Sequence, residues 1–315
     1  MTPEAAEGRG VVAVTGASGY IGSRLVAMLG TRARALVRSP VGAPTTDHRV
    51  VDLLADPDEI AADLDGVDAV VHLAGHNEVV AAADPDRALS ETVVAARHLV
   101  AAAAAADVRR MVYVSTVHVY GARAEEGARL DEDIVPEPAT VYSIARLASE
   151  HVIRAAASDS VVLRLTNAVG APASPAVDRW TLVATDLCRQ AVRDGKLVLR
   201  SSGRQWRDFV DLGDVCSAIA ECTRPRPVEP GTYNLGAGIP HTVLDLATLV
   251  QDRMEVQTGQ RPPLEAPPHD GPHPAPHHVD TGRLASAGIT CDRPLSESVD
   301  ELVAFCLEHQ EALRA

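Results

Sequence analysis

The sequence predicts the α/β class: a doubly wound parallel sheet, with a smaller domain formed mainly by the later part of the chain. Two observations predict the sheet. First, short apolar stretches alternate with helical ones through the first half of the chain, which is the rhythm of βαβ units. Second, the stretch Val11 to Gly22 reads VVAVTGASGYIG, a strand, a tight glycine turn and the start of a helix. In that context a glycine-rich turn is typical of Rossmann-type dinucleotide-binding folds.

The later elements are expected in alternating order. Strands are expected at residues 33–37, 50–53, 69–73, 111–114 and 161–165, with helices at 56–64, 86–106 and 142–157. After a loop-like stretch, the pattern predicts a helix at 180–194, a strand at 197–199, a sheet-and-helix unit from 210 to 222, a strand at 232–238 and a helix at 242–254. We therefore expect residues 1–170 plus about 210–240 to form the dinucleotide-binding domain, and about 171–209 plus 241–315 to form the substrate-binding domain.

Composition narrows the possible partners. The chain has 315 residues, of which 46% are hydrophobic and only 3% aromatic, so alanine and valine must fill the core. The net charge is −14 and no basic stripe is visible, which argues against nucleic acid and anionic membranes as partners. The polar, acidic N-terminus lacks the features of a signal peptide, and no apolar run has the length of a membrane span. Five scattered cysteines suit a reducing compartment, so we expect a cytoplasmic protein.

The glycine turn has a physical role for each glycine. Gly16 permits a sharp exit from the strand, Gly19 lets backbone N–H groups approach a pyrophosphate, and Gly22 lets the helix pack closely on the sheet. The phosphates would sit at the helix N-terminus, where unpaired N–H groups and the helix dipole favour anions. The alternative is an ordinary turn between a strand and a helix.

The residues after the second and third strands bear on the choice of dinucleotide. NAD-binding sheets commonly place a carboxylate after the second strand for the ribose hydroxyls, but here Arg38 stands there. Arg38 could pair with a 2′-phosphate, which favours NADP over NAD, or it could be a solvated surface residue. Asp52, at the end of the expected third strand, could accept a hydrogen bond from the adenine amine.

Eight motifs together carry a resemblance to a known family. They are TGASGYIG (15–22), VVDL (50–53), VVHLAG (70–75), VYVSTVHVYG (112–121), YSIAR (142–146), RLTNAVG (164–170), RQWRDFVDLGDV (204–215) and YNLGAG (233–238). In their order and spacing they resemble the extended short-chain dehydrogenase/reductases, the branch of nucleotide-sugar epimerases, dehydratases and reductases. The resemblance covers nearly the whole chain.

The resemblance implies a catalytic group. Tyr142 matches the tyrosine that moves a proton to or from a sugar oxygen while hydride passes to or from nicotinamide, and Thr116 matches the residue that hydrogen-bonds the same oxygen. A tyrosine of pKa about 10 is a poor base at neutral pH, but a nearby fixed cation favours its phenolate form. Arg146 lies four residues after Tyr142, on the same helix face. Asn167 and Arg207 match positions that hold the diphosphate of a nucleotide sugar.

The same resemblance implies a binding site for NAD(P). The cofactor-binding residues would be Gly16, Ser18, Gly19, Tyr20, Ile21, Gly22, Arg38, Asp52, Leu53, Leu73, Ala74, Gly75, Tyr142 and Arg146.

Three residues depart from the family pattern. Arg146 stands where the family has lysine; it keeps the charge but not the geometry, so it either replaces the lysine or leaves a slow or inactive enzyme. Thr92 stands where the family usually has a backbone-fixing asparagine. Val117 and His118 follow Thr116 where 4,6-dehydratases have two carboxylates, which argues against that activity. His118 could contact substrate or be a packed loop residue.

The stretch 262–278 is rich in proline and contains His269, His273, His277 and His278. Without cysteines or regular ligand spacing we interpret it as a surface loop with no metal site. In the family that it resembles this region covers the sugar pocket, which would make the loop a lid.

The expected function is redox chemistry on a nucleotide-activated sugar, either 4-keto reduction or epimerisation through a keto intermediate. The alternatives are a dinucleotide-binding protein without catalysis and a reductase of a non-sugar carbonyl. Many relatives in the family dimerise through two helices per subunit, here 86–106 and the helix of Tyr142, so a homodimer is expected.

Overall fold

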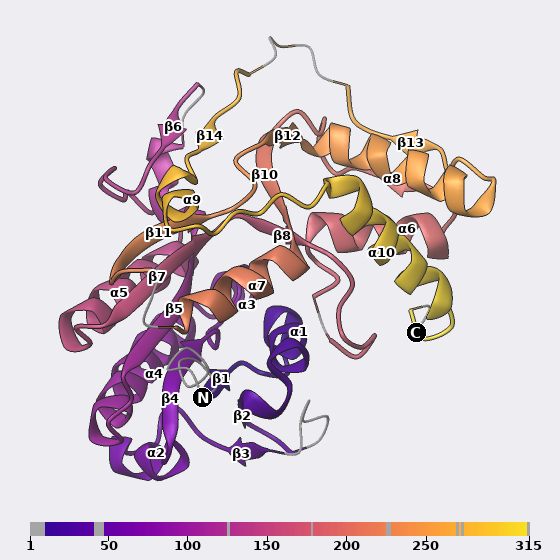
Figure 1. Cartoon of the computed structure of the whole chain (residues 1–315). Coiled ribbons are helices and arrows are strands. Elements are labelled where there is room, and N and C mark those ends of the chain that lie inside the picture. Colours follow the sequence, from indigo (N-terminus) through magenta and orange to yellow (C-terminus); the bar gives the residue numbers. More distant parts are fainter. Residues whose placement is uncertain are drawn as a thin grey trace.

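The computed structural model describes residues 10–40, 47–124, 127–177, 179–224, 228–268, 271 and 274–313. Its largest feature is a seven-stranded sheet in which all neighbouring strands run parallel (Figure 1). In spatial order the strands are β11 (Gly231–Leu235), β7 (Ser160–Leu165), β5 (Arg110–Thr116), β4 (Val67–His72), β1 (Val11–Thr15), β2 (Ala33–Val37) and β3 (His48–Val50).

Helices cover both faces of this sheet, so the predicted doubly wound fold is confirmed. One face is covered by α1 (Tyr20–Leu29) and α7 (Leu212–Cys222), which bury Leu25 and Ile219 against alternate strand residues. The other face is covered by α2 (Pro57–Asp63), α4 (Pro85–Ala105) and α5 (Val141–Ala156), which bury Leu99 and Ile153. Side chains that alternate along each strand supply both cores, and most of them are valine or alanine.

The helix α4 is the one described helix that is long and apolar enough to cross a membrane by length and composition. In this fold 44% of its apolar window is buried, and it packs on α2 and α5. We therefore treat α4 as a core helix of the sheet.

The later chain builds a second core beside the large sheet. Its three-stranded sheet has the order β12 (Pro240–Thr242), β10 (Trp206–Asp211), β8 (Asn167–Val169). The helices α6 (Val183–Arg193), α8 (Val243–Thr258) and α10 (Leu295–Glu308) pack together around Leu187, Leu246 and Leu302 (Figure 1). The remaining elements are η2 (Gly30–Arg32), α3 (Glu78–Ala83), η3 (Val117–Arg123), β6 (Arg129–Leu130), β9 (Leu197–Val198), β13 (Leu264–Glu265), β14 (His278–Val279) and α9 (Gly282–Ser286).

Two predicted elements are displaced. The third strand ends at Val50 instead of extending to Leu53, because the carboxylate of Asp52 accepts the N–H of Leu54 and turns the chain away from the sheet. The unit expected to begin at residue 210 begins at Trp206, because β10 pairs antiparallel with β12 as well as parallel with β8. Thus β10 belongs to the small sheet, whereas α7 packs on α1 and β11 completes the edge of the large sheet.

Candidate active site

The site begins where β1 and β4 end, side by side in the sheet. The chain leaves β1 toward β2 on one side, while β4 lies on the other, so a crevice opens between their carboxyl ends. The hydroxyl of Thr15 accepts the N–H groups of Leu73 and Ala74, each at 3.2 Å. These bonds hold the turn after β4, with Gly75, against the glycine turn after β1.

The glycine turn has the geometry that a close-approaching phosphate needs. Gly16 has φ +65°, and a Cβ built on Gly22 would lie 2.1 Å from the Gly16 carbonyl oxygen, so neither position accepts a side chain without displacement. Gly19 is the N-cap of α1, with no side-chain cap and no acidic residue in the first turn. The first N–H groups of α1 therefore suit an anionic group.

The other predicted cofactor residues differ in their exposure and in their hydrogen bonds. Ser18 is exposed, whereas the Tyr20 side chain is buried and its hydroxyl donates to the Gly170 carbonyl at 2.7 Å. Arg38 is exposed directly after β2, where no carboxylate stands, and Asp52 is exposed beyond β3. Arg38 therefore presents an exposed guanidinium at the end of β2.

The predicted catalytic residues Thr116, Tyr142 and Arg146 come from β5 and α5. Thr116 ends β5, and its hydroxyl oxygen accepts the N–H of His118 at 3.2 Å. A capping box formed by Thr140 and Ser143 starts α5, which fixes Tyr142 in the first helical turn. One turn later, Cζ of Arg146 lies 5.5 Å from the centre of the Tyr142 ring. The structure therefore brings Tyr142 and Arg146 together, as their spacing predicts.

Arg146 is 8% exposed, and its Nε and Nη1 atoms have no hydrogen-bond partner among the described residues. Burial lowers the pKa of Arg146, but the hydroxyls of Tyr113 and Tyr142 outweigh it and raise the pKa above its usual value. Its guanidinium lies against Gly75, where a Cβ would sit 3.1 Å from Nη2. A permanent cation with free donors beside the cofactor turn suits the hydroxyls of a bound ribose.

Thr92, at the position where the family usually has asparagine, contacts the segment after Gly75. Its hydroxyl oxygen accepts the N–H of His76 at 3.4 Å, and the side chain is buried on α4. The segment after Gly75 is therefore fastened to α4 by a hydroxyl instead of an amide.

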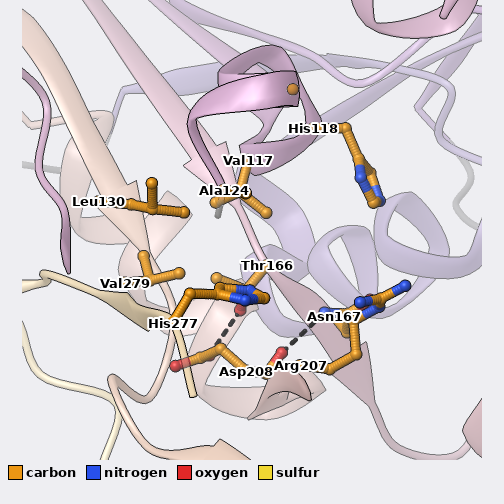
Figure 2. Close-up of a pocket in the computed structure, with 11 residues that line it drawn as sticks. Val117, His118, Ala124, Leu130, Thr166, Asn167, Arg207, Asp208, His277 and Val279 are labelled. Atoms are coloured by element: carbon orange, nitrogen blue, oxygen red, sulfur yellow. Dashed lines mark hydrogen bonds between the residues drawn. The ribbon is translucent and has the colours of Figure 1, made fainter. Parts of the chain in front are cut away.

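A pocket of about 150 Å³ is lined by His118, whose ring contacts that of Tyr142. Figure 2 shows this pocket. It contains the predicted substrate residues His118, Asn167 and Arg207. The register of β8 with β10 pairs Asn167 with Phe209, and the Asn167 amide donates to the Asp208 carbonyl at 2.8 Å. The pocket is lined by Val117, His118, Gly121, Ala124, Leu130, Thr166, Asn167, Arg207, Asp208, His277 and Val279.

The described lining of this pocket holds one cation, Arg207, and one carboxyl group, Asp208, whose pKa is raised by burial. Burial lowers the pKa of Arg207, and no described ion pair includes this residue. Burial, and then the charge of Arg207, lower the pKa values of His118 and His277. The His118 and Tyr142 rings meet edge to face with centroids 6.3 Å apart, so the predicted catalytic tyrosine contacts a residue that lines this pocket.

Sequence reasoning missed several lining residues. Asp208 directly follows Arg207, and its carboxylate accepts from the Thr166 hydroxyl at 2.8 Å, which no spacing rule indicates. The sequence predicts a surface loop over the pocket for the histidine-rich stretch, and His277 lies in a loop segment with its side chain lining the pocket. His269 and His273 lie outside the described residues. Within the described chain, no three His, Cys, Asp or Glu side chains are grouped to hold a metal ion.

The fold and this site define a dinucleotide-dependent enzyme of the short-chain dehydrogenase/reductase type. A model of the NAD dependent epimerase/dehydratase family matches residues 12–236, and the chain belongs to that family. The resemblance seen in the sequence is thereby confirmed.

Curated relatives match along most of the chain. A dTDP-6-deoxy-L-talose 4-dehydrogenase (NAD(P)(+)) of Kitasatospora kifunensis is 33% identical over 92% of this chain and 94% of that protein. A GDP-6-deoxy-D-mannose reductase of Pseudomonas aeruginosa is 30% identical over 78% of this chain and 80% of that protein. The solved structure of MoeE5 in complex with UDP-glucose and NAD is 25% identical, with a TM-score of 0.80, over 96% of this chain and 100% of that one.

Proposed function

We propose that this protein transfers hydride between NADP and C4 of a nucleotide-activated sugar, as a 4-ketoreductase or the reverse dehydrogenase. The observation that carries the proposal is the pairing of Tyr142 with Arg146, with the Tyr142 ring against His118, which lines a pocket whose cation, Arg207, has no carboxylate partner among the described ion pairs. The relatives named as a 4-dehydrogenase and a reductase act on nucleotide sugars of this kind.

The residues divide the chemistry between them. A bound nicotinamide supplies or accepts the hydride. Because the Thr116 oxygen already accepts the N–H of His118, its own O–H is left to donate to the substrate oxygen. Tyr142 gives that oxygen a proton during reduction or takes one during oxidation, and the Arg146 cation stabilises the phenolate. Asn167 and Arg207 hold the diphosphate, which fixes the sugar over the reacting groups.

Arg38 favours NADP and thereby reduction over epimerisation. It is exposed where an NAD-specific site would have a carboxylate, and a guanidinium pairs well with a 2′-phosphate. A cofactor that is consumed and exchanged suits a reductase, whereas an epimerase regenerates the cofactor it holds. Epimerisation stays the second candidate, because a dTDP-L-rhamnose 4-epimerase is 30% identical over 36% of this chain.

We also propose that the later core is the substrate-binding domain and that the protein is a cytoplasmic homodimer. All five cysteines are free thiols, which suits a reducing compartment. The dimer would form through α4 and α5, which pack on each other and expose Leu89 (40%) and Ile144 (43%). Sedimentation of the protein with both residues changed to glutamate tests this, since a dimer built on these helices would dissociate.

The activity is tested with 4-keto nucleotide sugars carrying uridine, thymidine or guanosine diphosphate. A stoichiometric loss of nicotinamide absorbance with NADPH supports the reductase, and turnover with no net cofactor change indicates an epimerase. Binding of NADPH without turnover on the whole panel would leave a non-catalytic dinucleotide-binding protein. Tyr142→Phe is the control, because it keeps the ring and removes the proton donor.

A further inference from the structure

One side of the Arg207 pocket is formed by a short ribbon, which consists of residues 128–132 and 277–280. Its strands β6 and β14 form a two-stranded sheet of their own, with Leu130 opposite Val279. Both of these side chains line the pocket (Figure 2). Together with Tyr120 they form a small apolar cluster, separate from the cores of the larger sheets. The ribbon is therefore a wall of the pocket that needs its own attachment to the rest of the fold.

Asn234, on the edge strand β11, attaches the ribbon to the large sheet. The residue is 0% exposed, and its side-chain amide donates to the carbonyls of Leu130 at 3.0 Å and Asp280 at 2.9 Å. Its backbone N–H donates to the carboxylate of Glu132 at 2.8 Å. In the described part of the chain, every hydrogen bond between the large sheet and the ribbon comes from Asn234.

The side-chain oxygen of Asn234 holds a second wall of the same pocket. The Tyr120 hydroxyl donates to this oxygen at 2.7 Å, and burial raises the pKa of the phenol, so the hydroxyl keeps the proton that it donates. Tyr120 belongs to η3, in which Val117 and Gly121 line the pocket. One buried amide therefore joins η3 to the ribbon, with both N–H groups and its oxygen paired.

The segment that carries β14 has another attachment, to the small sheet. The indole N–H of Trp206, on β10, donates to the Pro274 carbonyl at 2.8 Å. His277 and Val279 follow Pro274 and precede the contact with Asn234, and both line the pocket. This part of the wall is thus held at each end, by one residue of each sheet.

We propose that Asn234 is a positioning residue for the substrate, because it fixes the ribbon that presents His277 and Val279 to a nucleotide sugar held by Arg207. Asn234 itself does not line the pocket, so it acts through the ribbon. A wall that is fixed before binding does not have to be ordered by the ligand, which favours affinity. This inference rests on the proposed function, because it takes the Arg207 pocket as the substrate site.

The test compares two affinities, neither of which requires turnover. Titration calorimetry gives the Kd for UDP-glucose, dTDP-glucose and GDP-mannose, and fluorescence titration gives the Kd for NADPH. Asn234→Leu keeps the size of the side chain and removes its three hydrogen bonds. We expect the Kd for the nucleotide sugar that binds best to rise about tenfold, the size of one or two hydrogen bonds. The Kd for NADPH is expected to change less than about twofold, because β7, β5 and β4 separate β11 from β1 in the sheet.

Thr232→Val is the matched control. Thr232 lies two residues before Asn234, on the same face of β11, and is 7% exposed. Its hydroxyl has no hydrogen-bond partner among the described residues, so the substitution is expected to leave both affinities unchanged. Trp206→Phe is the second variant, which removes the indole N–H and keeps an aromatic ring. It is expected to raise the Kd for the nucleotide sugar about threefold, the size of one weak hydrogen bond, and to leave NADPH binding unchanged.

An unchanged Kd for the nucleotide sugar in Asn234→Leu overturns the proposal. Equal rises in the Kd values for nucleotide sugar and NADPH also overturn it, because they indicate a general loss of structure. If Asn234→Leu does not fold, an unchanged Kd for the nucleotide sugar in Trp206→Phe overturns the proposal instead. A wild-type protein that binds none of the three nucleotide sugars overturns the proposed function and this inference with it. Normal wild-type binding that Arg207→Ala weakens and Asn234→Leu does not overturns this inference alone.

Discussion

Replacing Arg207 with alanine is expected to weaken nucleotide diphosphate binding by roughly 30- to 150-fold. The guanidinium lines the pocket (Figure 2), and only its Nη1 has a described bond, to the Trp206 carbonyl at 2.7 Å. The neighbouring Asp208 carboxylate is engaged by Thr166 and by the Ala237 N–H. The cost of burying Arg207 is already present in the free protein. The remaining N–H donors of Arg207 are therefore expected to stabilise a bound diphosphate by about 2–3 kcal/mol, which corresponds to the roughly 30- to 150-fold change in affinity.

The assay is titration calorimetry with uridine, thymidine and guanosine diphosphates at saturating NADPH. Arg154→Ala is the matched control, since it removes the same charge from an exposed position in the last turn of α5, far from Tyr142 on that helix. The control is expected to change affinity less than about twofold at physiological salt, where distant exposed charges are screened. If Arg207→Ala binds every diphosphate as well as Arg154→Ala does, the pocket does not hold a diphosphate, and a non-sugar carbonyl substrate becomes the better explanation.

Glu150→Ala is expected to lower the free energy of unfolding by about 3–5 kcal/mol in urea titrations. The side chains of Arg164 and Glu150 form an ion pair and are 5% and 2% exposed, so the substitution leaves a buried guanidinium without its carboxylate. A loss below about 1 kcal/mol would contradict this. Gly75→Ala is expected to weaken NADPH binding, because the added methyl group would press on the guanidinium of Arg146. Gly66→Ala is the control and is expected to leave NADPH binding unchanged, since Gly66 also has a positive φ but open space around it. Between about pH 6.5 and 3, the His72 ring takes up a second proton in the unfolded chain but stays neutral in the folded protein. The free energy of unfolding therefore falls as the pH drops through that range. His72→Asn should reduce the slope of unfolding free energy against pH by up to about 1.4 kcal/mol per unit, and equal slopes would refute the assignment.

The sheet and the glycine turn were predictable because their causes are local. Alternating apolar strands and helices imply a parallel sheet, and Gly16 and Gly22 occupy positions of the turn that do not accept a side chain without displacement. The helical spacing of Tyr142 and Arg146 likewise places them on one face before any tertiary contact forms.

The pocket beyond Tyr142 was only partly predictable, because it is assembled from distant segments. His277 comes from a stretch whose proline and histidine content is typical of a surface loop, yet it lines the same cavity as Asp208. The strand β10 begins at Trp206 because β12, more than thirty residues later, supplies hydrogen bonds that no local pattern reveals.

The sequence by itself determined the fold class, the dinucleotide turn and the helix that carries Tyr142 and Arg146, since periodicity and glycine geometry act over a few residues. Only the tertiary structure decided what surrounds Arg146. The turn after β4 brings Gly75 against its guanidinium, although β4 and α5 are far apart in the sequence. Burial and neighbouring charges depend on the whole fold, and these determine how the cation of this site is held.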